Sequence, residues 1–240
     1  MKKHIPNTIT CLNLFCGCLA CISAFKGDFL CTAVWVAAGS GFDFLDGLTA
    51  RLLKAYSPIG KELDSLADVI TFGLAPGIAV FTFLQLLLAQ EHEIVSPWFI
   101  KIIPYAAFLI PIFSALRLAK FNIDDRQSSS FIGLPVPANA LFWVSLLVGV
   151  KTWSLSGIYI PIAVVCLTIV FSLLLVSEIP MFSLKLKNFS WKDNVLQYIL
   201  IACMLLFVWI FCIGGVAFGI VTYIVLSIIG RSRFNFTPVV

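Results

Sequence analysis

Charged side chains are scarce in this sequence. They make up 12% of the 240 residues, whereas 60% are hydrophobic, and long apolar runs recur from one end to the other. No internal repeat, low-complexity segment or separate soluble domain interrupts these runs. This composition excludes an ordinary soluble domain and is typical of a helical protein that crosses the membrane several times. We therefore expect an all-α polytopic membrane protein.

Clusters of histidine and cysteine are also lacking. The two histidines, His4 and His92, are far apart in the sequence and are expected on opposite sides of the membrane. Cys18 and Cys21 form a CxxC, but it lies within an apolar run and no second CxxC accompanies it. Cysteine in such a run usually acts as a small hydrophobic residue. The pattern therefore disfavours zinc or redox chemistry and a covalent intermediate on cysteine or histidine.

The apolar runs predict about eight transmembrane helices, since most are long enough to cross ~30 Å of hydrocarbon. The fifth run is short and only Gly214-Gly215 divides the last two, so seven to nine helices fit the pattern. The expected spans are roughly 10–26, 29–53, 62–90, 98–118, 137–151, 156–178, 194–212 and 214–230.

The distribution of basic residues predicts the orientation. With a cytoplasmic amino terminus, only Lys26, Lys101 and Lys151 of the 16 basic residues lie on the outer side. The positive-inside rule therefore predicts that both termini and the 51–61 loop are cytoplasmic. In a bacterium this would be the inner (cell) membrane.

Four aspartates lie where apolar runs end and begin: Asp43, Asp46, Asp64 and Asp68. An ionisable group at membrane depth costs at least ~2.5 kcal/mol and marks a functional-site hypothesis. Four carboxylates together repel one another unless a cation neutralises them. Oxygen ligands suit hard cations such as Mg²⁺ or Mn²⁺.

The spacing places the aspartates on two helical faces. At ~100° per residue, one face carries the first two acids and the other carries the second two. A turn through Ser57-Pro58 would set the faces opposite each other, and Gly60 would remove bulk where a phosphate approaches. The first face comprises Asp43, Asp46, Gly47, Ala50 and Arg51, and the second comprises Gly60, Asp64 and Asp68.

Two further groups of polar residues each have two interpretations. Asn7, Thr10 and Asn13, near the start of the first span, are either interfacial caps or substrate contacts. The second group, at the cytoplasmic end of the fourth span, consists of Arg117, Lys120 and Asn122. It is either ordinary positive-inside anchoring or a cationic lip for a phosphate or carboxylate. The chain after residue 156 is expected to be scaffold, lipid contact or dimer surface.

The aspartate pattern DxxDGxxAR, eight residues, GxxxDxxxD resembles the signature of the CDP-alcohol phosphatidyltransferase family. The stretches 5–17, 115–122 and 133–139 are similar to the phosphatidylserine synthase branch of that family. Lys120 is one departure, because that branch would have arginine there, and lysine loses the bidentate geometry. The resemblance implies a single integral membrane domain over 1–240, with a catalytic core at about 5–180 and a helix pair at about 194–230.

The resemblance also implies a chemistry. The four aspartates would bind two divalent metals, Mg²⁺ or Mn²⁺, and Asp68 would also deprotonate the acceptor hydroxyl. Gly47, Ala50, Arg51 and Gly60 would line the donor site for CDP-diacylglycerol. The phosphatidyl group would pass to L-serine, with release of CMP. Arg117, Lys120 and Asn122 would bind the acceptor or a phosphate.

Other interpretations stay open at the level of sequence. The same family also suggests glycerol 3-phosphate or an inositol phosphate as acceptor. From another class, intramembrane acids can mark a cation transporter, although transport sites lie nearer the midplane. Membrane lipid and a homodimer are the expected partners, and no nucleic-acid binding is expected.

Overall fold

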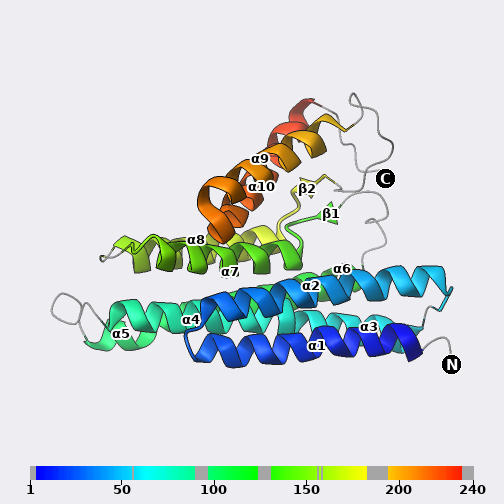
Figure 1. Cartoon of the computed structure of the whole chain (residues 1–240), viewed down its shortest axis with the longest axis horizontal. Helices are drawn as coiled ribbons and strands as arrows, with labels where there is room; N and C mark the ends of the chain where they lie inside the picture. The colour runs from blue at the N-terminus through cyan, green and yellow to red at the C-terminus, as the bar shows by residue number, and fades with distance from the viewer. Residues whose placement is uncertain are drawn as a thin grey trace.

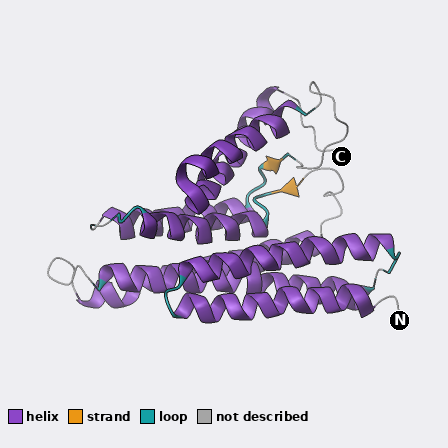
Figure 2. Cartoon of the chain, in the orientation of Figure 1, coloured by secondary structure: helices purple, strands orange, loops and turns teal. Residues whose placement is uncertain are grey.

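The computed structural model of the chain describes residues 4–55, 57–89, 97–123, 131–155, 157, 159–182 and 194–233. Within these ranges the fold is almost entirely helical (Figure 2). The α-helices are α1 (His4–Phe25), α2 (Phe29–Leu52), α3 (Pro58–Asp68), α4 (Ala75–Leu88), α5 (Pro97–Ile102), α6 (Leu109–Ile123), α7 (Val136–Thr152), α8 (Tyr159–Val176), α9 (Val195–Phe211) and α10 (Gly215–Arg233). Three further helical turns are η1 (Val69–Leu74), η2 (Ile103–Phe108) and η3 (Cys212–Gly214).

Six helical segments of the described chain are long and apolar enough to cross a membrane, which confirms a multi-pass membrane protein. One of them, Val195–Gly230, contains both α9 and α10, with η3 between them. Helix α7 is apolar but shorter. Each of the eight expected segments therefore contains a helix of the described chain.

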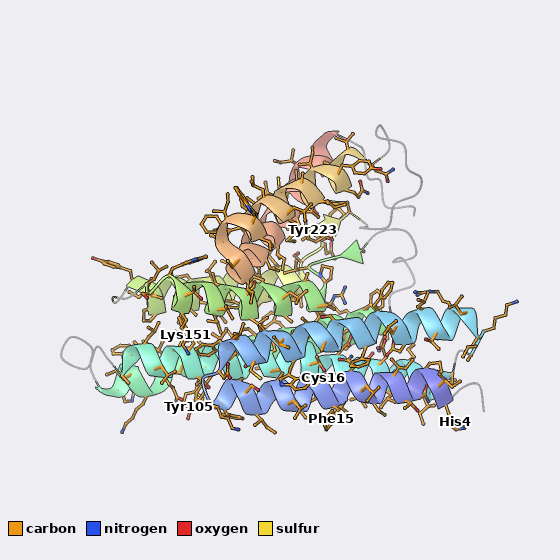
Figure 3. All side chains as sticks on the ribbon, in the orientation of Figure 1. His4, Phe15, Cys16, Tyr105, Lys151 and Tyr223 are labelled. Atoms are coloured by element: carbon orange, nitrogen blue, oxygen red, sulfur yellow. The ribbon has the colours of Figure 1, made fainter. Side chains whose placement is uncertain are left out.

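The helices lie in layers (Figure 1). Helix α1 packs along α2 and against α3 and α4, while α6 packs against η1 and α8. Helices α7 and α8 form a second layer, and α9 and α10 form a hairpin that leans away from it (Figure 1). Cys16 on α1 points toward α2, whereas Phe15 points outward (Figure 3). The first described helix begins, and the last one ends, toward the same end of the molecule.

Helices α3 and α4 form one continuous rod through a π-helical turn, η1, which begins directly after Asp68. Thr71 in this turn is fully buried, and its hydroxyl donates a hydrogen bond to the backbone oxygen of Asn13, 3.0 Å away. A Cβ at Gly17 would collide with Thr71, so only glycine allows α1 to approach this closely. Turns of the π type often occur at functional sites.

The sequence did not predict the short antiparallel pair β1 (Phe131–Ile132) and β2 (Pro180–Met181). The two strands lie side by side between the helical layers and the C-terminal hairpin (Figure 2). Gly133 follows β1 with φ +76°, and a Cβ there would meet the carbonyl oxygens of Leu175 and Ser177. Gly133 thus makes the turn that leads into α7.

Candidate functional site

The turn between α2 and α3 sets the two motif faces together, as the spacing predicted. Helix α2 closes with a hydrogen bond from the Ala55 amide to the carbonyl of Ala50. Ser57 caps α3, its hydroxyl accepting a hydrogen bond from the Gly60 amide at 3.1 Å, and Pro58 occupies the first turn. The caps fix where one helix ends and the next begins.

Three of the four aspartates converge. Asp43, Asp64 and Asp68 each offer a carboxylate oxygen, and these atoms all lie within 4.8 Å of one another. Asp68 is only 7% exposed, and the Oδ1 atom of Asp64 is buried without a hydrogen-bond partner among the described residues. Anions so close in an apolar setting need a cation, and an all-oxygen set fits a hard divalent ion. We call this set the aspartate cluster.

Asp46 lies beside the aspartate cluster and has its own partner. Its Oδ2 atom accepts a hydrogen bond of 2.7 Å from the hydroxyl of Thr10 on α1, and its side chain is 6% exposed. Asp46 also interacts electrostatically with Asp43 and Asp64. It therefore adds negative charge to the same site while α1 fixes its orientation.

Helix α1 also holds the aspartate cluster through Asn13. The Nδ2 atom of this fully buried residue donates a hydrogen bond to Asp68 Oδ1, 3.1 Å away. Thr10 and Asn13 therefore do not act as helix caps in this structure; they orient two of the carboxylates, and Thr10 also lines the cavity described next. The sequence offered one clue to this role, two polar residues three apart on one face of an apolar helix.

A cavity of ≈ 320 Å³ adjoins the acids. Arg51 and Lys61 supply positive charge to its wall, so an anionic group could bind there between the bases and a cation at the carboxylates. The guanidinium of Arg51 lies over Gly47, where it would contact any Cβ at 3.6 Å. The lining includes all four residues that the sequence assigned to the donor, and comprises Pro6, Asn7, Thr10, Asp46, Gly47, Ala50, Arg51, Ala55, Ser57, Gly60, Lys61 and Asp64.

Gly60 has a packing role that the sequence did not predict. A Cβ at this position would approach the Oδ1 atom of Asn7 and the hydroxyl of Ser57 to 2.9 Å. The glycine therefore makes room for these two side chains, and it also lines the cavity. It lets α1 pack against the first turn of α3, beside the cavity.

The three residues expected at the acceptor side have separate environments. Arg117 is buried and interacts electrostatically with Asp68. Lys120 is exposed. Asn122 links helices: its Nδ2 atom donates to the Ser65 hydroxyl at 2.8 Å, and its carbonyl accepts from Lys61 Nζ at 2.9 Å. Of the three, only Arg117 is both buried and electrostatically coupled to a member of the aspartate cluster.

Comparisons with known proteins agree with the motif. The family model for CDP-alcohol phosphatidyltransferase matches residues 3–221. A CDP-diacylglycerol–serine O-phosphatidyltransferase of Bacillus subtilis is 36% identical over 74% of this chain and 89% of its own length. Proteins of the same name match from Methanocaldococcus jannaschii, 30% identical over 92% of this chain and 94% of the relative, and from Helicobacter pylori. The Helicobacter pylori protein is 37% identical over 58% of this chain, and the match covers 55% of that relative.

Proposed function

Because this chain belongs to the CDP-alcohol phosphatidyltransferase family, we propose that it transfers the phosphatidyl group of CDP-diacylglycerol to L-serine and releases CMP. The relatives from Bacillus and Methanocaldococcus bear the name of that activity, and this chain matches most of their length. The observation that carries the proposal is the aspartate cluster beside a cavity lined by the remaining motif residues.

Enzymes of this family use divalent metals, and the aspartate cluster fits one. In our proposal Asp43, Asp46, Asp64 and Asp68 hold two ions, Mg²⁺ or Mn²⁺. The ions would neutralise the diphosphate of the donor and stabilise the charge that develops on the leaving group. The cytidine end of the donor would occupy the ≈ 320 Å³ cavity, beside Gly47, Ala50, Arg51 and Gly60.

Asp68 is the proposed base. Asn13 donates to its Oδ1 atom, so Oδ2 is the oxygen that we assign to the proton of the serine hydroxyl. The serine oxygen forms a bond to the lipid-side phosphorus, the bond from that phosphorus to the CMP oxygen breaks, and the proton passes to Asp68. Burial favours the proton transfer by weakening the hydration of the carboxylate.

Arg117 is the proposed partner of the serine carboxylate. It is the one residue of the expected acceptor group that is buried and near Asp68. Lys120, which is exposed, would attract anions at the entrance. Asn122 would act by fixing α3 to α6 through Ser65, one residue after Asp64.

We further propose eight membrane crossings, with both termini and the active site facing the cytoplasm, in the inner membrane of a bacterium. Two exposed residues, Lys54 and Ser154, allow a matched test, since they have similar φ values of 49° and 52°. They follow α2 and α7, which end at opposite ends of the bundle (Figure 1). In a cysteine-free background, an impermeant maleimide added to intact cells should label Ser154→Cys and spare Lys54→Cys. The reverse pattern would invert the orientation.

Membrane lipid is the proposed partner of the exposed apolar faces, which include Leu205 and Trp209 on α9. A homodimer would use one of these faces. Cross-linking in native membranes, followed by mass determination, distinguishes a dimer from a monomer in lipid.

The activity is tested with the purified chain in detergent, given CDP-diacylglycerol, Mg²⁺ or Mn²⁺, and labelled acceptors. Serine should yield phosphatidylserine and one CMP per lipid formed, and Asp64→Asn should yield neither. If product formed only with glycerol 3-phosphate or only with an inositol phosphate, that compound would replace serine as the proposed acceptor. No transfer to any acceptor would contradict the proposed reaction, and cation uptake into proteoliposomes would then favour a transporter.

A further inference from the structure

Two further cavities share Lys151, which lies near the end of α7 that points away from His4 (Figure 3). Each has a volume of ≈ 300 Å³, and Phe29 lines both of them. Their other walls are mostly apolar, with Phe83 of α4 in the first cavity and Ile213 of η3 in the second. Phe29 is ~21 Å along α2 from Asp43 at helical rise, so these cavities are separate from the aspartate cluster.

The ammonium group of Lys151 is fixed against the turn between α1 and α2. Its Nζ atom donates a hydrogen bond of 3.3 Å to the carbonyl of Gly27 and lies 5.4 Å from the centroid of the Phe29 ring. Gly27 has φ +70°, a conformation that favours glycine. An ammonium group has three N–H donors, so Gly27 leaves two for a ligand. Lys151 is exposed, and a ligand can therefore reach it.

Asp28 brings a negative charge to the second of these cavities. Its carboxylate caps α2 by accepting a hydrogen bond of 3.0 Å from the Cys31 amide. Asp28 and Lys151 are thus each held by a neutral backbone group while they line the same cavity. A ligand that carries both a phosphate and an ammonium group complements this pair, whereas Asp28 would repel a purely anionic ligand.

The surroundings favour a membrane lipid over a soluble molecule with the same two charges. Helix α2 is long and apolar enough to cross a membrane, and Asp28 directly precedes it, at the depth expected of lipid head groups. Leu30 and Ile213, which line the same cavity as Asp28, are 52% and 40% exposed. Apolar walls beside a fixed cation provide contacts for acyl chains next to a head group.

We propose that a phospholipid with an ammonium head group, such as phosphatidylethanolamine, binds here in the leaflet opposite to the aspartate cluster. Lys151 binds its phosphate, Asp28 binds its ammonium group, and the apolar walls of the two cavities contact its acyl chains. The lipid is not a substrate, because none of the four motif aspartates lines either cavity. It joins the start of α2 and the end of α7 to η3 in the C-terminal hairpin, independently of the proposed reaction.

The test is native mass spectrometry of the delipidated chain in detergent, titrated with phosphatidylethanolamine or with phosphatidylglycerol of identical acyl chains. The parent should bind phosphatidylethanolamine more tightly. Lys151→Met keeps an apolar stem and should weaken binding of both lipids about tenfold, the size of one hydrogen bond to a charged group. Asp28→Asn keeps the helix cap and should reduce the preference for phosphatidylethanolamine by about two- to fivefold, the range of an exposed ion pair.

Lys26→Met is the matched control, since it removes the same charge from an exposed residue of the same turn that lines neither cavity. It should bind both lipids as the parent does. Unchanged binding in Lys151→Met, an equal loss in Lys26→Met, or a parent that prefers phosphatidylglycerol would overturn the inference. A second copy of the chain bound in place of lipid would also overturn it. If Lys151→Met does not fold, Asp28→Asn decides alone, and an unchanged lipid preference in that variant would overturn the inference.

Discussion

The side-chain amide of Asn13 and the carboxylate of Asp68 form a hydrogen bond of 3.1 Å across 55 residues of sequence. The backbone oxygen of the same asparagine accepts from Thr71, three residues beyond Asp68. Asn13 thus binds one residue just before the π-turn, Asp68, and one residue within it, Thr71. The orientation of the proposed base is set by a helix that carries none of the four aspartates.

Asn13→Ala should lower kcat by about 10- to 100-fold, the usual cost of losing a residue that orients a metal-binding carboxylate. The KM for CDP-diacylglycerol should change little, because the cavity lining keeps its composition. Steady-state kinetics in detergent measures both constants. Ser23→Ala is the control, since its hydroxyl bonds to Leu19 and Cys31 at the other end of α1. If Asn13→Ala were as active as the parent, Asn13 would have no role in orienting the carboxylate.

Removal of metal should abolish turnover. Chelation with EDTA should stop CMP release, and added Mg²⁺ or Mn²⁺ should restore it, because three carboxylates within 4.8 Å of one another repel without a cation. Chelation should also lower the unfolding temperature of the parent, whereas Asp64→Asn should lose most of that metal-dependent stabilisation. Full activity in EDTA would contradict the metal site.

The Asp68→Asn variant tests whether Asp68 acts as the general base or mainly as a metal ligand. General-base catalysis contributes about 10²- to 10⁴-fold, so kcat should fall within that range. Binding of CDP-diacylglycerol in the presence of metal should weaken far less, because Asp43 and Asp64 remain. Equilibrium binding of labelled donor to the variant supplies the comparison. Equal losses in donor binding and turnover would make Asp68 mainly a ligand.

Close packing at the π-turn gives a prediction about stability. Gly17→Ala would bring a Cβ against the backbone of Thr71, 2.9 Å from its Cα atom, and should cost about 1–3 kcal/mol as an overpacked contact. Gly41→Ala meets nothing within 4 Å and should be neutral or slightly stabilising. Unfolding temperatures of the two variants in detergent make the comparison. Equal temperatures would show that α1 can move without cost.

Local patterns in the sequence predicted the part of the site that lies on neighbouring helices. The spacing of the four aspartates and the Ser57-Pro58 turn are local features, and the structure confirms the turn and the convergence of Asp43, Asp64 and Asp68. The hydrophobic runs likewise predicted the helices, since burial in lipid imposes helical hydrogen bonding on every span.

The partners contributed from a distance were not predictable in this way. Thr10 and Asn13 look like caps until α1 is packed against Asp46 and Asp68. Tyr223 is one aromatic residue among many in apolar helices, and only the fold brings it to Phe182. The strands β1 and β2 have two residues each, too few for any alternation to be visible.

The π-turn at Val69–Leu74 holds one residue more than an α-helix that turns through the same angle. In regular α-helical geometry, that extra residue would rotate the part of the rod beyond it by ~100° about the axis. The buried face of α4, which includes Ile78 and Phe83, would then be out of phase with Asp64 and Asp68. The wider turn thus takes up one residue while the half of the rod that carries the aspartates and the half that packs into the core keep their relative rotation.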